Sequence, residues 1–306
     1  MTLRQAAKAA IERVLRHTLA NPRRMAGRSL VLAYHNVVPD AEAGRGDRSL
    51  HIPLSRFATH LDLIAAHCRV LPLEEVLAGP PPAGVPTVAI TFDDAYKGAV
   101  ELGLPELARR RLPGTLFVAP GLLGQRSFWW DEQGEHPGGL SEEVRKRALD
   151  QHMGKDTVIR AALPPAPSAG RLPTSYGCAT ADQVTHMARS GRVTLGAHSW
   201  SHPNLASLDP EALSDEMSRP LAWLRATTVP MVSFVAYPYG LASPAVEVAA
   251  EEAGYAAGLL VEGGWLHRKG SPWQIPRLNV PAGLSEAGLM LRLAGVLDAP
   301  PRLAGR

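Results

Sequence analysis

From residue 29 onward, short apolar runs alternate with segments in which apolar residues recur every three or four positions. The runs predict strands at 29–34, 85–92, 114–119, 192–197, 231–236 and 256–261. In the segment 57–70, Phe57, Leu61, Ile64 and Ala65 share one face, which predicts a helix there. Strands that alternate with helices predict βα units and a parallel sheet. With about seven such units and no glycine fingerprint of a dinucleotide-binding fold, we expect an α/β fold with a closed or nearly closed barrel.

Residues 125–180 interrupt this alternation. They contain Phe128-Trp-Trp-Asp131, a charged helical stretch at 141–160 and a proline-rich segment at 163–167. We therefore expect an insertion on one barrel unit, which forms a lid or a wall beside the site. The chain then divides into an arm at 1–28, a domain at 29–295 that carries the insertion, and a tail at 296–306.

Composition excludes several classes of protein. With 45% hydrophobic and 20% charged residues among 306, the chain can bury a sizeable core and is not intrinsically disordered. Two cysteines, Cys68 and Cys178, cannot form the disulfide framework of a small secreted domain. No run approaches the about 18–20 apolar residues of a membrane-spanning helix. Charged residues also interrupt every apolar run near the start, where a secretory signal needs about 7–15 unbroken apolar positions. We therefore expect a cytoplasmic protein.

The positive charge of the chain is concentrated in its first 28 residues. This arm carries seven basic side chains and one acid, whereas residues 29–306 carry 25 basic and 28 acidic groups. A nucleic-acid-binding domain would place basic charge on its folded body, so we expect no nucleic-acid partner. Leu3, Ala7, Ile11, Val14 and Leu15 share one helical face, and basic residues occupy most of the remainder. The arm is then either a helix packed on the domain or frayed from it, or a contact with a partner or with the anionic inner face of a membrane.

Ionisable side chains follow three of the predicted strands at their carboxyl ends. His35 follows the first strand, Asp93 and Asp94 follow the second, and His198 and His202 follow the fourth. In parallel α/β folds these ends meet on one side, where catalytic groups gather. Each cluster alone has an ordinary explanation, such as a helix cap for the aspartates or a structural pair for the histidines. Together they predict one site.

Two imidazoles and one carboxylate would make an open three-ligand site for Zn²⁺, with a position left for water. The histidine pair is not the helical zincin motif, because Ser199 stands where that motif has glutamate and Pro203 disfavours a helix at His202. Neighbouring strand residues point to opposite faces, so Asp93 and Asp94 both reach the site only if the chain bends between them. One carboxylate on a metal and one left free is the arrangement that metal-assisted hydrolysis requires.

Three segments resemble signature motifs of the polysaccharide deacetylases, the NodB-homology group or carbohydrate esterase family 4. They are Thr91-Phe-Asp-Asp-Ala-Tyr96, His198-Ser-Trp-Ser-His202-Pro-Asn-Leu205 and Phe234-Val-Ala-Tyr-Pro-Tyr-Gly240, and the resemblance covers residues 29–281. It implies a distorted (β/α)7 barrel with one divalent metal ion, usually Zn²⁺. The implied activity removes N-acetyl groups from an amino-sugar polysaccharide, oligosaccharide or glycan precursor.

The resemblance also implies roles for individual residues. Asp94, His198 and His202 resemble the metal ligands, and Asp93 resembles the general base. Tyr239 resembles the residue whose backbone N–H holds the oxyanion.

Aromatic residues near these motifs are candidates for substrate binding. The rings of Tyr237 and Tyr239 are expected to line the substrate groove. Trp129 and Trp130 either stack on a sugar ring or fasten the insertion to the core.

The sequence departs from the better-known members of the family at two positions. Those members carry a catalytic histidine after a leucine-rich strand near the C-terminus, whereas here Leu30-Val-Leu-Ala-Tyr-His35 resembles that strand moved to the front, as in circularly permuted deacetylases of poly-N-acetylglucosamine. We therefore expect His35 to be the general acid, although it could instead cap a buried strand. Many members also have an arginine where Ala236 stands. We expect Arg277 to replace it beside Asp93, with a surface salt bridge as the alternative.

Two other functions remain open at this point. A barrel that binds glycans without catalysis is one, although binding alone needs no free carboxylate beside a metal. A metal amidase or deformylase that acts on a non-sugar amide or a formyl group is the other.

Overall fold

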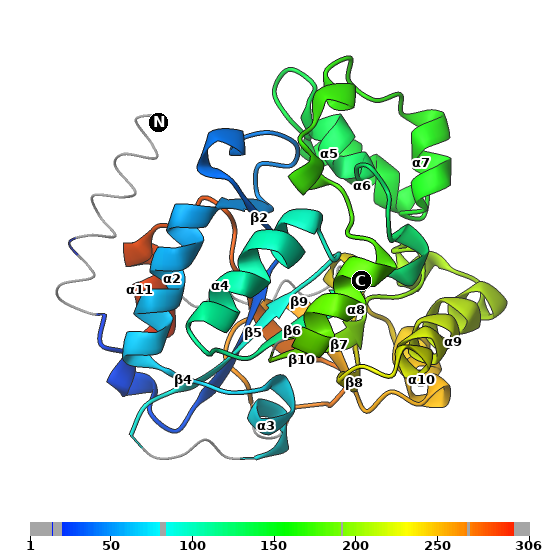
Figure 1. Cartoon of the computed structure of the whole chain (residues 1–306). Helices are drawn as coiled ribbons and strands as arrows, with labels where there is room; N and C mark the ends of the chain where they lie inside the picture. Colours follow the sequence, from blue (N-terminus) through cyan, green and yellow to red (C-terminus); the bar gives the residue numbers. More distant parts are fainter. Residues whose placement is uncertain (1–13, 15–19, 80–83, 191, 268–269, 297–306) are drawn as a thin grey trace.

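The computed structural model describes residues 14, 20–79, 84–190, 192–267 and 270–296. Within them, parallel strands close into a seven-stranded barrel in the order β1-β10-β9-β8-β7-β6-β5, and β1 pairs back onto β5 (Figure 1). The barrel strands are β1 (Ser29–Tyr34), β5 (Thr87–Phe92), β6 (Gly114–Val118), β7 (Val193–Ala197), β8 (Met231–Ala236), β9 (Ala257–Gly263) and β10 (Ile275–Asn279). The expected barrel is confirmed, and each predicted strand is present with its bounds within two residues of the expected ones.

Helices surround the barrel on its outer side, as the alternation of patterns predicts. They are α2 (Leu54–His67), α3 (Leu73–Ala78), α4 (Leu104–Arg109), α8 (Ala181–Ser190), α9 (Pro210–Thr227), α10 (Pro244–Ala253) and α11 (Glu286–Leu293). In α2 the expected residues Phe57, Leu61 and Ile64 are buried, but Ala65 is exposed and His60 is buried with the others. The apolar stripe of α2 is therefore rotated slightly from the predicted one, and it includes an ionisable side chain.

Shorter elements connect this frame. A two-stranded parallel sheet of β2 (Asn36–Val38) and β3 (His51–Pro53) follows β1, and β4 (Arg69–Val70) pairs with the start of β5. The single-turn helices are η1 (Pro22–Met25), η2 (Asp40–Glu42), η3 (Ala99–Gly103), η4 (Pro120–Leu122), η5 (Ala169–Arg171), η6 (Thr174–Tyr176), η7 (Leu205–Ser207) and η8 (Pro238–Gly240).

The inside of the barrel is a packed core. One apolar residue from each of five strands meets there, namely Val31, Ala89, Phe117, Ala236 and Leu259. Gly196 of β7 gives the Phe117 ring its space, because a Cβ at that position would lie 2.5 Å from the ring. A much larger core fills the space between the barrel and its helices.

The first strand of the domain closes the barrel. Leu32 of β1 pairs with Ile90 of β5 on one side and with Leu278 of β10 on the other. Because all three strands are parallel, His35 follows β1 at the same end of the barrel at which Asp93 and Asp94 follow β5. The N-terminal strand of the domain, β1, thus lies between β5 and β10, the second and the last barrel strands in the sequence.

Residues 125–180 form a separate layer over one end of the barrel (Figure 1). This insertion contains α5 (Trp129–Gly134), α6 (Glu142–Asp150) and α7 (Asp156–Ala162). The β2–β3 loop is fastened to it by an ion pair from Arg145 to Asp47 and by a hydrogen bond from the Gly46 N–H to Glu135. Gly134 allows the close approach, because a Cβ there would lie 2.3 Å from the Gly46 backbone.

The helix expected in the arm lies largely outside the described residues, as does the tail from residue 297 onward. Within the described part of the arm, η1 places Met25 in the core, where it is 7% exposed. Among the described residues, no helix has both the length and the apolar character needed to cross a membrane.

The buried His60 predicts how stability depends on pH. Burial lowers the pKa of its imidazole from 6.5 to about 4, so between these values the unfolded chain binds a proton that the folded chain does not. The free energy of unfolding should therefore fall as pH falls through this range, by about 2 kcal/mol at pH 5 from this group alone. Between pH 7 and pH 5, the wild type should therefore lose about 2 kcal/mol more unfolding free energy than a His60→Leu variant, as measured by urea denaturation. Equal losses in the two proteins would contradict the assignment.

Candidate metal centre

The chain turns sharply where β5 ends, at Asp93 and Asp94. Asp94 and Ala95 have φ of 68° and 52°, in the left-handed region that residues with side chains rarely adopt. Neighbouring strand residues point to opposite faces, so this turn allows both carboxylates to reach the same end of the barrel. The bend that the site requires is therefore present. Backbone strain of this kind is concentrated at functional sites in proteins.

The loop after β7 carries His198 and His202 on a similarly constrained backbone. Ser199 and His202 have φ of 60° and 59°, and Ser199 Oγ accepts a hydrogen bond from the His202 N–H at 2.9 Å. Glu216 of α9 accepts hydrogen bonds at 2.8 Å from the backbone N–H groups of the two residues before His202. These bonds hold the loop in a shape that directs both imidazoles toward Asp94.

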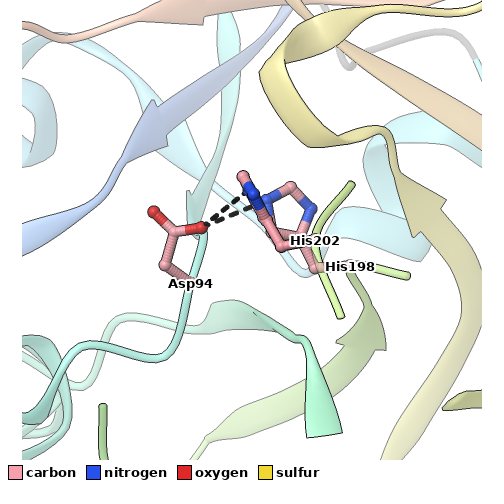
Figure 2. A group of neighbouring side chains, drawn as sticks. All are labelled: Asp94, His198 and His202. Atoms are coloured by element: carbon pink, nitrogen blue, oxygen red, sulfur yellow. Dashed lines mark ion pairs between the residues drawn. The ribbon is translucent and has the colours of Figure 1, made fainter. Parts of the chain in front are cut away.

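Asp94, His198 and His202 converge on one point (Figure 2). Asp94 Oδ1 lies 3.3 Å from His198 Nε2 and 3.2 Å from His202 Nε2, and the three ligand atoms all lie within 4.8 Å of one another. All three side chains are buried. The sequence prediction that these residues meet is confirmed.

The donor set fits a divalent cation. Asp94 Oδ1 is buried without a hydrogen-bond partner among the described residues, although it faces two imidazole nitrogens. Burial opposes the charge of Asp94, but the two histidines hold the pKa of its carboxyl well below its usual range. A positive ion would stabilise an ionised carboxylate oxygen and two Nε2 atoms that all point at one another. This set of ligand atoms is typical of zinc sites.

The two histidines are oriented in different ways. His198 Nδ1 lies 2.7 Å from the carbonyl oxygen of Ala236, so it carries the proton and leaves the Nε2 lone pair free for a metal. His202 Nδ1 is buried and has no hydrogen-bond partner in the described part of the chain. The His202 ring instead packs against Trp130, with ring centres 5.0 Å apart, and against Tyr239 at 4.6 Å.

Asp93 is paired with Arg277 rather than with the cation ligands. Arg277 Nη1 and Nη2 donate to the two carboxylate oxygens at 2.8 and 2.7 Å, while its Nε donates to the Leu260 carbonyl at 2.6 Å. Nη1 also donates to Thr91 Oγ1 at 3.2 Å. Arg277 is fully buried, so the surface salt bridge that was the alternative does not describe this contact.

Arg277 lies inside the barrel. Its guanidinium is 5.5 Å from the centre of the Phe117 ring, which belongs to the interior cluster. Ala236, where many family members carry an arginine, belongs to the same cluster. An arginine from β10 therefore pairs with Asp93 where the residue on β8 is too short to do so.

Burial and the neighbouring charges have opposing effects on the pKa values of Asp93 and His35. Burial opposes ionisation of Asp93, but Arg277 and then His198 hold the pKa of its carboxyl below its usual range. Burial also lowers the pKa of His35, while Asp94 and Asp93 act against this effect. The His35 side chain is half-buried, and it is close enough to both aspartates for their charges to act on it.

The two tyrosines of the third motif have separate positions. Tyr239 has φ of 58° within η8, and its ring packs on His202 beside the cation ligands. Tyr237 is fully buried, and its ring lies against Gly258 of β9. Ala236 ends β8 and points into the barrel, whereas Tyr237, the extended residue after it, belongs to the core between the barrel and its helices and so points outward. The structure places Tyr239 at the site and Tyr237 away from it.

The tryptophans of the insertion reach the site but are covered. Trp129 and Trp130 are 1% and 4% exposed and belong to the main core cluster. Trp129 Nε1 donates to the Tyr239 hydroxyl at 3.3 Å, and Trp130 packs on His202. Neither indole has an open face for a sugar ring. The geometry fits the alternative in which these residues fasten the insertion to the core.

Comparison with known proteins identifies the family. A family model described as polysaccharide deacetylase matches residues 81–258, which is more than half of the chain. The chain belongs to this family. The polysaccharide deacetylases are hydrolases of carbohydrate esterase family 4, and the matched range contains Asp93, Asp94 and both histidines. His35 and Arg277 lie outside it. A search of curated proteins found no match.

Solved structures of deacetylases have the same fold. The deacetylase PplD from Streptococcus pyogenes, in complex with acetate, is 17% identical with a TM-score of 0.61, over 88% of this chain and 99% of that one. IcaB from Ammonifex degensii is 17% identical with a TM-score of 0.62, over 90% and 99%. A de-N-acetylase from Aggregatibacter actinomycetemcomitans is 17% identical with a TM-score of 0.61, over 87% and 99%. At these identities the similarity shows the shared barrel.

Several buried polar residues around the centre could not be recognised from the sequence. Asp131 accepts hydrogen bonds from Tyr96 and His51 next to Trp130, and all three residues are nearly or fully buried. Asp131 and Tyr96 each end a motif that was singled out for other reasons. For Asp131, its position directly after two tryptophans was the available signal, but that position does not reveal which partners it meets.

Removing Arg277 should destabilise the protein through Asp93. An Arg277→Met variant leaves a buried carboxylate without its partner, which costs about 3–5 kcal/mol of unfolding free energy at pH 7. Asp93 has a lowered pKa in the wild type, so its contribution is present at neutral pH and is lost as pH falls through that pKa. The deficit of the variant should therefore shrink in acid. Urea denaturation at several pH values measures this.

A second substitution tests the cause. Combining Arg277→Met with Asp93→Asn removes the unpaired charge and should recover part of the lost stability. If the single variant loses less than about 1 kcal/mol, the pair lacks the assigned importance.

Proposed function

We propose that this protein is a metal-dependent N-deacetylase that acts on an amino sugar in a polysaccharide, an oligosaccharide or a glycan precursor. One observation carries the proposal: Asp94 shares a cation site with two histidines, while the adjacent Asp93 is outside that set and is kept ionised by Arg277. A binding protein has no need for a charged carboxylate that stands beside a metal site without being one of its ligands.

Asp94, His198 and His202 would hold the metal, for which we propose Zn²⁺ because two imidazoles and a carboxylate are typical zinc ligands. When bound, such an ion acidifies water and polarises a carbonyl group. The His198 Nδ1 bond to Ala236 keeps the ring oriented for this task.

Asp93 is the proposed general base. Its carboxylate is ionised at neutral pH because Arg277 lowers its pKa, and each oxygen keeps a lone pair beyond those used by the guanidinium. It takes a proton from the water that attacks the acetamide carbonyl. The bidentate contact with Arg277 also fixes the direction of the carboxylate, so that the base need not reorganise.

His35 and Tyr239 complete the proposed mechanism. His35 lies within the field of both aspartates and gives a proton to the departing amine. The Tyr239 backbone N–H, at the left-handed turn in η8, donates to the oxygen on which charge develops. Removal of such a donor from other enzymes costs about 2.7–4 kcal/mol. The products are acetate and a free amino sugar, and the deacetylase from Streptococcus pyogenes solved with acetate supports this product.

The base assignment can be tested separately from metal binding. An Asp93→Asn variant should retain Zn²⁺ at wild-type stoichiometry, because Asp93 is not a ligand, and should lose about 10²–10⁴-fold in turnover. A His202→Ala variant should lose both metal and turnover. Released acetate with N-acetylglucosamine oligomers and metal analysis of the purified proteins provide the two measurements. Activity retained in Asp93→Asn would exclude Asp93 as the base.

The same assay separates the competing functions. Acetate release that a chelator abolishes supports the deacetylase. Oligomer binding without release favours a glycan-binding barrel. Activity on simple amides or formyl groups alone favours a metal amidase or deformylase.

We further propose that the arm brings the enzyme to an anionic membrane surface, where a lipid-linked glycan precursor is the substrate. The support is the cluster of basic side chains in residues 1–28. Replacing Arg4, Lys8, Arg13 and Arg16 together by Gln should abolish sedimentation with anionic liposomes while leaving acetate release from soluble oligomers unchanged. These substitutions spare Met25, which is part of the core. Unchanged sedimentation would reject the membrane contact.

A further inference from the structure

The proposed metal site leaves one of its ligands without a hydrogen bond to orient it. His198 is fixed by the Ala236 carbonyl, but His202 Nδ1 has no such partner within the described residues. Metal-binding histidines nearly always have this bond, because it sets the direction of the ring. For His202, the rings of Trp130 and Tyr239 on its two sides must therefore do this work.

Trp130 is itself held by a buried hydrogen-bond chain. Its Nε1 lies 2.6 Å from the Tyr96 hydroxyl, and that hydroxyl lies 2.8 Å from Asp131 Oδ2. The indole N–H can only donate, so the Tyr96 oxygen accepts from Trp130 and gives its own proton to Asp131. The donor and the acceptor of both hydrogen bonds are therefore determined, and the Asp131 carboxylate must accept the second one.

The second oxygen of Asp131, Oδ1, must also accept a hydrogen bond. Asn36 Nδ2 donates to the Ser175 carbonyl at 3.0 Å, which fixes the orientation of the amide. The same Nδ2 lies 3.0 Å from His51 Nδ1, so that nitrogen accepts and the proton of His51 is on Nε2. His51 Nε2 lies 2.7 Å from Asp131 Oδ1 and donates to it.

Asp131 thus accepts hydrogen bonds from two side chains, Tyr96 and His51, and each of them can only act as a donor toward it. Its Oδ1 also accepts from the Asp47 backbone N–H at 2.9 Å, and the residue is fully buried. None of these donors is a Lys or Arg side chain. A buried carboxylate kept in such surroundings is costly unless its acceptor capacity is needed.

We propose that Asp131 is a positioning residue for the metal site: through Tyr96 it locks Trp130 against His202 and so replaces the hydrogen bond that this ligand lacks. The proposal rests on the proposed metal centre and adds to it a connection from the insertion to one ligand. An amide at position 131 cannot do this work, because its NH₂ group would face either the Tyr96 hydroxyl or the His51 N–H, each of which is a donor.

Zn²⁺ affinity tests the proposal without any assay of activity. Asp131→Asn and Tyr96→Phe should each weaken Zn²⁺ binding by at least about tenfold in competition with a chelating indicator, as is typical when support behind a ligand is lost. Tyr96→Phe keeps the ring, which packs 4.5 Å from Phe128, and removes only the hydroxyl. It therefore serves as the test if Asp131→Asn does not fold.

A double variant distinguishes positioning from general destabilisation. If both residues act through one chain, Asp131→Asn in the Tyr96→Phe background should weaken Zn²⁺ binding little further. The two effects would instead multiply if each residue acted alone.

Asp47→Asn is the matched control. Asp47 is also a buried carboxylate, on the β2–β3 loop where that loop meets the insertion, but its side chain contacts Arg145 and Ser49 and not Tyr96. This variant should lose stability and keep wild-type Zn²⁺ affinity. Wild-type affinity in Asp131→Asn or Tyr96→Phe, or an equal loss in Asp47→Asn, would overturn the positioning role. Failure of the wild-type protein to bind Zn²⁺ would overturn the metal centre, and this proposal with it.

Discussion

Two adjacent buried carboxylates cannot share one counter-charge, and the whole site follows from how this chain separates them. Asp93 receives a guanidinium from inside the barrel, and Asp94 is turned by its left-handed backbone toward two imidazoles. Without the turn, the two carboxylates would point to opposite faces of β5. Without Arg277, Asp93 would be a buried charge with no partner, and its ionised form would be disfavoured.

The insertion contributes to the site by support rather than by open surface. Its tryptophans are buried, and they touch Tyr239 and His202 from behind. The contacts between Asp47 and Arg145 and between Gly46 and Glu135 fasten the same layer to the β2–β3 loop. Segments from before and after β5 thus brace a ligand that is carried on the loop after β7.

Periodicity predicts the barrel, the order of the strands brings the candidate ligands together, and the resemblance to polysaccharide deacetylases supplies their role and the pairing of Arg277 with Asp93. Strand ends meet on one side of a parallel barrel whatever lies between them, so the residues after β5 and β7 can be placed together from the order of the strands alone. Tyr237 shows the limit of this reasoning, because the motif does not reveal that its ring points outward while Tyr239 packs at the site.

The network around Asp131 could not be predicted for a related reason. Its members come from β2, β3, the turn after β5, and the insertion, and no local pattern links Asn36 to His51 or Tyr96 to Trp130. Likewise, the position of His60 on the buried face of α2 depends on a small rotation of the helix that its apolar residues do not determine. Contacts that depend on the exact packing of distant segments need the three-dimensional structure.

The placement of β1 has a consequence for how the protein is made. Among the barrel strands β1 is synthesised first, yet it pairs with β10, which is synthesised after all the others. The barrel therefore cannot close before β10 has been synthesised, and its many contacts between distant parts of the sequence predict slow folding. Until β10 emerges, the apolar edge of β1 has only β5 as a partner and remains exposed to aggregation or to chaperones.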